Sequence, residues 1–206
     1  MTDVAVYLAS RSPRRQELLR QIGVAFDELK LREAPGRHRD VVEEARDREP
    51  PLHYVERIAR TKATVGWKRM EQRGLPPRPV LGADTEVVLD DAIFGKPADV
   101  DAARRMLAQL SGRRHEVMTA VALKWQQEVE VAVSVSHVTF RRLTAGEIER
   151  YVATGESADK AGGYAIQGAG GVLVAAVTGS VSNVVGLPLA TVRSLATRLG
   201  VDLLGG

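Results

Sequence analysis

Residues 116–125 (EVMTAVALKW) and 129–140 (VEVAVSVSHVTF) form two runs of apolar and strand-favouring residues, joined by the polar connection QQE. Valine, threonine and aromatic side chains are enriched in strands, and a short connection between two such runs is typical of a hairpin. We therefore predict a long antiparallel hairpin here. Such a hairpin favours a mixed sheet over a purely parallel one, because the other strands alternate with helices.

On both sides of the hairpin, strand-like and helix-like segments alternate irregularly. The apolar run 4–9 predicts a short strand, and the tight turn SRSP precedes a helix from Arg14 to Ile22. The other expected elements are a weak strand at 25–31, a charged loop at 32–51, a helix at 53–70, strands at 80–83 and 86–89 interrupted by Asp84-Thr85, a helix at 101–110, a helix opened by a capping box at 144–147, and a C-terminal helix between Pro188 and Gly200. This order predicts an α/β fold with a mixed, twisted β-sheet flanked by helices.

The composition narrows the classes of protein. A chain of 206 residues with 44% hydrophobic and 27% charged residues suits one globular domain, residues 1–206, and excludes a fibrous or wholly disordered protein. The absence of cysteine excludes disulfides, thiolate metal sites and cysteine nucleophiles. The formal net charge of +3 is too small to indicate nucleic-acid binding by itself.

The apolar segments are too short for a membrane protein. Asp3 and the short apolar stretch before Ser10 differ from the basic start and longer apolar core of a signal peptide. The uncharged apolar run 172–177 is far shorter than a bilayer span. We expect a cytoplasmic protein with no membrane partner.

Familiar nucleotide and metal motifs are incomplete. The GKP triplet at 95–97 lacks the upstream glycine and the hydroxyl residue of a phosphate-binding loop, and the glycines at 168, 170 and 171 do not make a dinucleotide fingerprint. The histidines at 38, 53, 115 and 137 are scattered, so neither a histidine metal site nor a serine-histidine-aspartate triad is expected.

Asp84 stands out because it lies among apolar residues between two strand-like runs. Open α/β sheets bind ligands at strand ends, and a carboxylate there could serve as a metal ligand or as a base that activates water. The alternative is that Asp84 only caps a turn through its own side chain. The pattern alone favours neither interpretation.

Several cationic and polar residues have a functional and a structural interpretation. Arg14 and Arg15 open a helix, where the helix dipole disfavours cations unless an anion is shared with the helix amides. Lys96 lies between a glycine and a proline in a rigid turn, whereas Lys62 fits an ordinary solvated face of a helix. Gln167 follows a glycine-rich segment and could read the edge of a base, or could simply face solvent.

Taken together in order, these segments resemble the Maf family of nucleoside triphosphate pyrophosphatases. The matching segments are Leu8-Ala-Ser10-x-Ser12-Pro-Arg-Arg15-x-Glu17-Leu-Leu19, Ile58-Ala-Arg-x-Lys62-Ala63, Gly82-Ala-Asp84-Thr85, Gly95-Lys-Pro97, Ser111-Gly112 with His115-Glu116-Val117, Asp159-Lys-Ala-Gly162-x-Tyr164-x-Ile-Gln167-Gly168, and Gly179-Ser-x-x-Asn183-Val-Val-Gly-Leu-Pro188. They extend from about residue 6 to 190, nearly the whole chain. Chance does not readily produce so many blocks in order.

The resemblance implies a fold, an activity and an assembly. The fold would be Maf/inosine triphosphatase-like, with two lobes around a central cleft, and the protein a homodimer. The implied reaction is Mg²⁺-dependent (or Mn²⁺-dependent) cleavage between the α and β phosphates of a nucleoside triphosphate, giving the monophosphate and pyrophosphate. No stable nucleic-acid partner is expected.

The resemblance also implies roles for single residues. Asp84 matches the family's proton acceptor, and Arg14, Thr85 and Gln167 match positions tied to base choice in the branch that acts on dTTP and UTP. The residues matching the nucleotide or phosphate site are Ser10, Arg15, Lys62, Lys96 and Asn183. The metal would be held by Asp84 and Glu44, with Glu43 as the rival, because the preceding loop is longer than usual in the family.

Two other functions stay open at this stage. A Maf enzyme of different base preference would have the same mechanism. A nucleotide- or nucleic-acid-binding regulator of cell division would need a continuous basic stripe, but acids at 43, 44, 47, 49 and 56 interleave with the arginines.

Overall fold

A seven-stranded mixed sheet forms the centre of the computed structural model, which describes residues 5–32 and 39–203. The strands are β1 (Val6–Leu8), β2 (Phe26–Glu28), β3 (Val80–Leu89), β4 (Ala92–Phe94), β5 (Arg114–Trp125), β6 (Glu128–Phe140) and β7 (Val174–Thr178). Their order is β2-β1-β3-β5-β6-β7, with β4 paired to β3. β1 runs parallel to β2 and β3, whereas the β3–β4 and β6–β7 pairs are antiparallel, so the predicted α/β class with a mixed sheet is confirmed.

Six α-helices and two 3₁₀ segments are found in the described part of the chain. They are α1 (Pro13–Gln21), α2 (Pro51–Gln72), α3 (Val100–Leu110), α4 (Ala145–Ala153), η1 (Ala161–Gly163), η2 (Ala169–Leu173), α5 (Val181–Val185) and α6 (Leu189–Arg198). None of the helices in residues 5–32 and 39–203 combines the length and the apolar character needed to cross a bilayer.

The chain divides into two compact units, and β3, β5 and β6 each contribute residues to both. The first unit comprises Met1–Asp84, Thr119–Ser134 and Gly186–Gly206; the second comprises Thr85–Met118 and Val135–Val185. Each unit has a hydrophobic cluster of its own. The assignment of residues 1–206 to one domain, and the cleft between two lobes, stay predictions.

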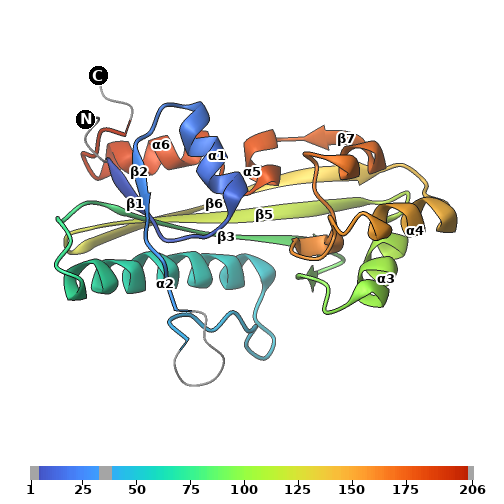
Figure 1. Ribbon diagram of the computed structural model, residues 1–206, viewed down its shortest axis with the longest axis horizontal. Helices are drawn as coiled ribbons and strands as arrows, with labels where there is room; N and C mark the ends of the chain where they lie inside the picture. The colour runs from blue at the N-terminus through green and yellow to red at the C-terminus, as the bar shows by residue number, and fades with distance from the viewer. Residues whose placement is uncertain (1–4, 33–38, 204–206) are drawn as a thin grey trace. The chain divides into compact units, whose positions relative to one another are not determined.

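In the first unit, helices cover both faces of the strands: α1 and α6 lie on one side and α2 on the other (Figure 1). Helix α2 packs very closely, because the position of a Cβ added to Gly66 would be only 2.8 Å from Val80 Cγ1. A small buried cluster packs at the inner face of α2. It is formed by Tyr7, Ala9, Leu29, Met70 and Val80. This packing fixes the helix that carries Lys62.

The second unit is built around a larger buried cluster of aliphatic and aromatic side chains. It includes Val87, Phe94, Leu107, Phe140, Tyr151 and Tyr164. Helix α4 begins with a full capping box, in which Thr144 accepts from the Glu147 amide and the Glu147 side chain accepts from the Thr144 amide. The predicted capping box is therefore confirmed.

Most predicted elements are confirmed, and the differences have local causes. Strand β3 is continuous over ten residues, so the predicted interruption at Asp84-Thr85 was wrong. Strands β5 and β6 are neighbours in the sheet and are joined at Gln126-Gln127, as the hairpin predicted. Strands β4 and β7 and the short helix α5 were not foreseen. Residues 33–38 of the predicted loop lie outside the described residues, and so does Val4 of the first predicted strand.

Candidate active site

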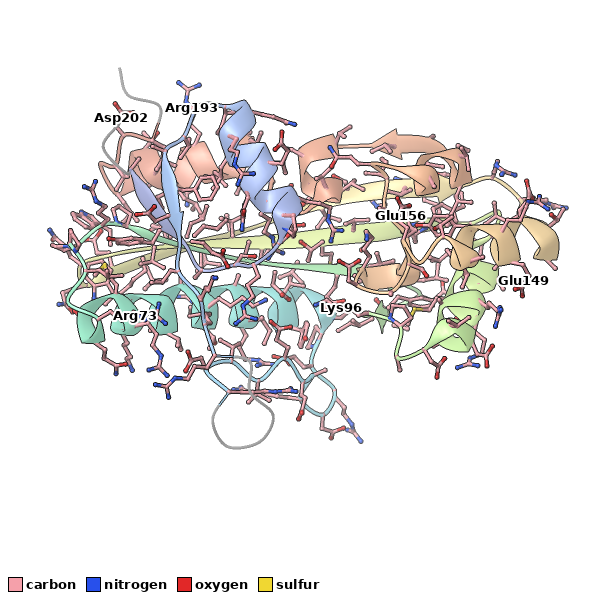
Figure 2. The ribbon with its side chains drawn as sticks, viewed as in Figure 1. Arg73, Lys96, Glu149, Glu156, Arg193 and Asp202 are labelled. Carbon is pink, nitrogen blue, oxygen red and sulfur yellow. The ribbon has the colours of Figure 1, made fainter. Side chains whose placement is uncertain are left out.

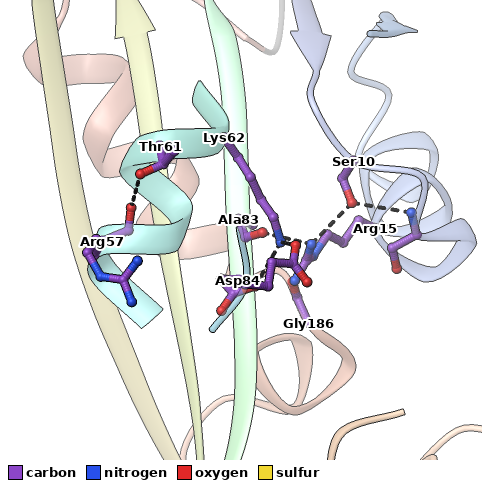
Figure 3. A network of polar contacts seen from close by, with 10 residues as sticks. Ser10, Arg15, Arg57, Thr61, Lys62, Ala83, Asp84 and Gly186 are labelled. Carbon is purple, nitrogen blue, oxygen red and sulfur yellow. Dashed lines mark hydrogen bonds and ion pairs between the residues drawn. The ribbon is translucent and has the colours of Figure 1, made fainter. Parts of the chain in front are cut away.

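Asp84 is a buried carboxylate on β3 and ends Met1–Asp84, the first of the three segments of the first unit. Only 6% of the residue is exposed, and its Oδ1 lies 2.8 Å from Lys62 Nζ (Figure 3). Its Oδ2 is buried and accepts no hydrogen bond from any of the described residues. Because a buried carboxylate oxygen without a partner is costly, this oxygen points to a ligand or to a chemical role. The alternative that Asp84 caps a turn is excluded, since it lies inside a continuous strand.

The close approach of α2 to β3 explains how Lys62 reaches Asp84. Gly82 lies two residues before Asp84, so the two positions point to the same face of the strand. A Cβ added to Gly82 would lie 2.6 Å from Ala59 O, 2.6 Å from Ala63 N and 3.1 Å from Lys62 Cβ. Glycine at 82 therefore lets the helix backbone lie directly against the strand, where the long side chain of Lys62 extends to the carboxylate.

Arg15 fixes the backbone next to Asp84 from another direction. The side chain is buried in the first unit, and its Nη1 donates to Ala83 O at 2.9 Å and to Ser10 Oγ at 3.1 Å, while its Nε donates to Gly186 O at 2.8 Å (Figure 3). Helix α1 places Arg15 there because Pro13 starts the helix, a position that tolerates its missing amide hydrogen. Arg15 is thus a positioning residue for the Asp84 strand.

The two candidate acids, Glu43 and Glu44, lie in the loop before α2. Of these two, Glu43 contacts Lys62. Glu43 Oε1 lies 2.6 Å from Lys62 Nζ. Glu44 instead contributes its backbone carbonyl, which accepts from Arg57 Nη2 at 3.0 Å. The same Arg57 makes two 2.6 Å contacts with the Glu49 carboxylate, which hold the loop against α2. The sequence leaves Glu43 and Glu44 as rivals, because the loop is longer than usual in the family and its alignment with the family is open by one residue.

The oxygen donors at this point suit a hard divalent cation. Mg²⁺ prefers carboxylate and water oxygens and usually takes one or two carboxylates from the protein. The orphaned Asp84 Oδ2 and the nearby Glu43 carboxylate match that requirement. In residues 5–32 and 39–203 no group of three or more histidine, cysteine, aspartate or glutamate residues is arranged to hold a metal ion. The assignment of the metal to Asp84 and Glu44 stays a prediction.

Four of the predicted site residues lie in the second unit: Thr85, Lys96, Gln167 and Asn183. Lys96 is exposed in the turn after β4 (Figure 2). Its neighbour Gly95 accepts a hydrogen bond from the Gly162 amide at 3.1 Å, which ties the lysine turn to the glycine-rich segment. Arg14 remains in the first unit, half-buried in the first turn of α1.

Gln167 is exposed. Three sets of side-chain contacts within the second unit hold the segment that carries it. The Glu156 carboxylate accepts from the amides of Ala169 at 3.1 Å and Gly170 at 2.8 Å (Glu156 is labelled in Figure 2). Tyr151 Oη accepts from the Ala165 amide at 3.1 Å. The segment that carries Gln167 is thus a fixed turn, and Glu156 is a residue that the sequence analysis missed.

The third attachment is a buried pair of aromatic side chains. His115 Nε2 and Tyr164 Oη are 2.8 Å apart, and both residues are buried. Burial lowers the pKa of His115 from 6.5 to about 4 and raises the pKa of Tyr164 above its ordinary value. The imidazole is therefore neutral at neutral pH and serves to anchor Tyr164.

Asn183 is fully buried and makes contacts inside the second unit. Its Nδ2 donates to Val117 O and to Ser136 Oγ, both at 2.9 Å. These bonds join α5 to β5 and β6. A role of Asn183 toward a nucleotide stays a prediction.

Comparison with models of known protein families shows to which family this chain belongs. The model of the family described as Maf-like protein matches residues 5–199. The chain belongs to the Maf family. The family match covers both units and every residue of the Asp84 site described above, including Gly82 and Glu43.

Relatives of this family align over almost the whole chain. A protein of Nitrosomonas europaea named dTTP/UTP pyrophosphatase is 48% identical over 96% of this chain and 96% of its own length. Proteins of the same name from Nitrosospira multiformis and Anaeromyxobacter dehalogenans are 55% and 51% identical, and cover 89% and 95% of this chain and 89% and 94% of their own lengths. The solved structure of the Staphylococcus aureus Ham1 protein is more distant, with 12% identity, a TM-score of 0.41 and coverage of 66% of this chain and 71% of that chain.

Proposed function

We propose that this protein hydrolyses dTTP and UTP to the nucleoside monophosphate and pyrophosphate. Family membership and relatives that carry this activity in their names, at 45–55% identity, support the proposal. The structural observation on which the proposal depends is the environment of the two carboxylate oxygens of Asp84. One carboxylate oxygen is held by Lys62, and the other is buried and accepts nothing from the described residues.

Such a carboxylate can act as a general base. In the proposed reaction a water oxygen attacks the α phosphorus, the bond to the α–β bridging oxygen breaks, and pyrophosphate leaves with that oxygen. Asp84 Oδ2 would accept the proton of the attacking water. Arg15 holds the carbonyl of the residue before Asp84, which limits how the base can turn, and Lys62 holds Oδ1 in the nucleotide-free protein.

Positive charge is needed because the leaving pyrophosphate gains negative charge. Lys62, whose ammonium is at the site, and the exposed Lys96 are the proposed partners of the phosphates. We propose Mg²⁺ or Mn²⁺ as the metal, with Asp84 and an acid of the 43–44 pair as ligands; a bound divalent ion supplies Lewis acidity and lowers the pKa of water.

Base choice is proposed to depend on Arg14, Thr85 and Gln167. Gln167 has both a donor and an acceptor, and its segment is fixed by Glu156 and Tyr151. We propose in addition that the protein is a homodimer and acts in the cytoplasm, where nucleoside triphosphates are found. The elution volume on a calibrated column with light scattering tests the dimer.

The test of the function is hydrolysis of a panel of nucleoside triphosphates with Mg²⁺, with products separated by ion exchange. We expect UMP or dTMP plus pyrophosphate, faster than for purine triphosphates, and loss of turnover when EDTA removes the metal. Release of a diphosphate and phosphate would contradict the proposed bond. Turnover of purine triphosphates alone would indicate a Maf enzyme of another base preference, and no turnover of any triphosphate would favour a binding protein.

A further inference from the structure

Lys62 occupies a position between two carboxylates. Its Nζ lies 2.8 Å from Asp84 Oδ1 and 2.6 Å from Glu43 Oε1. The lysine and aspartate side chains are 13% and 8% exposed, so water screens this pair weakly. An ammonium is a compact point charge on a flexible stem, and here it lies between oxygens that suit a hard cation.

A divalent cation on Glu43 and Asp84 would compete with this ammonium. Mg²⁺ binds carboxylate oxygens at about 2.0–2.1 Å and requires near-octahedral geometry. The ammonium already contacts one oxygen of each acid, and its charge repels a second cation. Both cations can be retained only if Lys62 moves away from the oxygens that the metal takes.

The charges indicate when that move becomes favourable. Two carboxylates and one ammonium leave a single net negative charge, whereas the same groups with a divalent ion carry a net positive charge. A triphosphate would neutralise that charge and would offer the displaced ammonium a new acceptor. Without a polyanion, the close ammonium–carboxylate contacts favour the metal-free arrangement.

We propose that Lys62 is an internal placeholder cation: in the nucleotide-free protein it occupies the divalent-cation site of Glu43 and Asp84, and it transfers to the phosphates when metal and triphosphate bind. Metal binding is thereby coupled to nucleotide binding. This inference rests on the proposed function for the identity of the polyanion, but the competition between lysine and metal does not require turnover.

The orphaned oxygen of Asp84 distinguishes this proposal from a merely structural ion pair. A lysine that served only to neutralise Asp84 would need neither Glu43 nor an unpartnered Oδ2 beside it. Arg57, whose guanidinium is bound to Glu49, also interacts electrostatically with Asp84, which is the last of the causes that raise the pKa of Arg57.

The direct test measures Mn²⁺ binding to the nucleotide-free protein by electron paramagnetic resonance of free Mn²⁺. Removing the ammonium in Lys62→Met should tighten binding by at least about tenfold, because the competing charge is gone. Lys62→Arg keeps the charge and should bind as weakly as the unmodified protein. Adding Glu43→Gln to Lys62→Met should remove most of the gain. A folded Lys62→Met protein that binds Mn²⁺ no more tightly would overturn the proposal.

A second measurement uses the unmodified chain and does not depend on how a variant folds. Acetylation of Lys62 by an amine-reactive reagent, followed by peptide mass spectrometry, should speed up at saturating Mn²⁺ because the displaced ammonium becomes accessible. Lys68, exposed on the same helix, is the control and should label at a constant rate. Unchanged labelling of Lys62 at saturating Mn²⁺ would refute the placeholder role.

The two proposals fail separately. If no triphosphate is hydrolysed but Lys62→Met gains Mn²⁺ affinity, the proposed function is wrong and the competition stands. If dTTP and UTP are hydrolysed but Mn²⁺ affinity and Lys62 labelling do not change, the function stands and the placeholder role is wrong.

Discussion

At the scale of single residues, the account depends on one carboxylate. Asp84→Asn keeps the size of the side chain and its contact with Lys62 but removes the acceptor of the water proton. We expect kcat for UTP to fall by roughly 10²–10⁴-fold, the contribution typical of a general base. Steady-state kinetics measure the loss, and circular dichroism checks that the fold is retained. The control is Asp27→Asn, an exposed acid on β2, which should leave kcat unchanged. Near-full activity of Asp84→Asn would remove Asp84 from the mechanism.

A second residue-scale prediction concerns the pH dependence of stability. The pKa of His115 falls from 6.5 to about 4 because the imidazole is buried. Between these pH values the unfolded chain therefore binds more protons than the folded protein. The contribution of neutral His115 to the free energy of unfolding is fully present above pH 6.5. It is lost as the pH falls toward 4, by up to about 3 kcal/mol. Urea unfolding at pH 6.5 and pH 5 measures the slope.

The matched variant for that measurement is His115→Gln. Glutamine does not titrate but can still hydrogen-bond Tyr164 Oη, so the free energy of unfolding should depend less on pH in this window. Few carboxylates titrate between pH 6.5 and 5, which makes the comparison specific. Equal slopes for the two proteins would show that His115 is not the titrating group.

The residue pattern singled out Asp84 without deciding its role and favoured an ordinary surface lysine at Lys62, and the family resemblance supplied the roles proposed for both. The ion pair of Lys62 with Asp84 joins positions 22 residues apart, and no periodicity relates them. The choice between Glu43 and Glu44 depends on the loop that Arg57 and Glu49 tie to α2, which is a tertiary contact. The sequence therefore suggested the candidate residues, left the choice of partner acid open, and did not predict the contacts that hold Asp84 and Lys62.

At the scale of elements, the approach of α2 to β3 is the most sensitive feature. In Gly82→Ala the new methyl group would lie 2.6 Å from two backbone atoms of α2, so the helix must shift. Overpacking of this kind typically costs about 1–3 kcal/mol, and the shift should also move Lys62 away from the position from which it reaches Asp84 and, in the proposed function, the phosphates. We expect a lower free energy of unfolding together with a lower kcat, measured by urea denaturation and UTP hydrolysis. The comparison is Gly23→Ala, where no atom outside the two neighbouring residues lies within 4 Å of the added Cβ and only the positive φ opposes the change. Normal kcat in Gly82→Ala would show that the close approach does not position the site.

The Gln167 segment gives a second prediction at this scale. Glu156→Gln weakens the two amide hydrogen bonds that hold residues 169 and 170 and leaves Asp84 untouched. Since Glu156 acts only through the segment, the ratio of kcat/KM for UTP to that for a purine triphosphate should fall several-fold, through KM more than kcat. Glu149→Gln, on α4 in the same unit, is the control. An unchanged ratio would mean that the hydrogen bonds do not position a base-reading group.

Sequence patterns within a segment predicted the helices and strands that depend on local residues. They missed the strands that depend on pairing with another strand. The capping box of α4 and the β5–β6 hairpin are local, and both were found. The polar pair Asp84-Thr85 suggested a break, but β3 stays extended through it and pairs with β1 before it, at residues 80–81, and with β4 after it, at residues 87–89. Strand β7 lies in a glycine- and alanine-rich stretch of low strand signal and is fixed by its register with β6.

At the scale of the whole molecule, the family match covers residues of both units. The reaction proposed for the protein is the cleavage of one bond. In the proposed function, the Asp84 site of the first unit would activate water, and the Gln167 segment of the second unit would select the base. The overall class, a mixed sheet flanked by helices, followed from the alternation of elements in the sequence.

The most direct test of the central claim, that water activated by Asp84 attacks the α phosphorus, is hydrolysis of UTP in ¹⁸O-labelled water with mass analysis of both products. The account predicts one ¹⁸O atom in UMP and none in pyrophosphate. Label in pyrophosphate, which would place the attack on the β phosphorus, would contradict it.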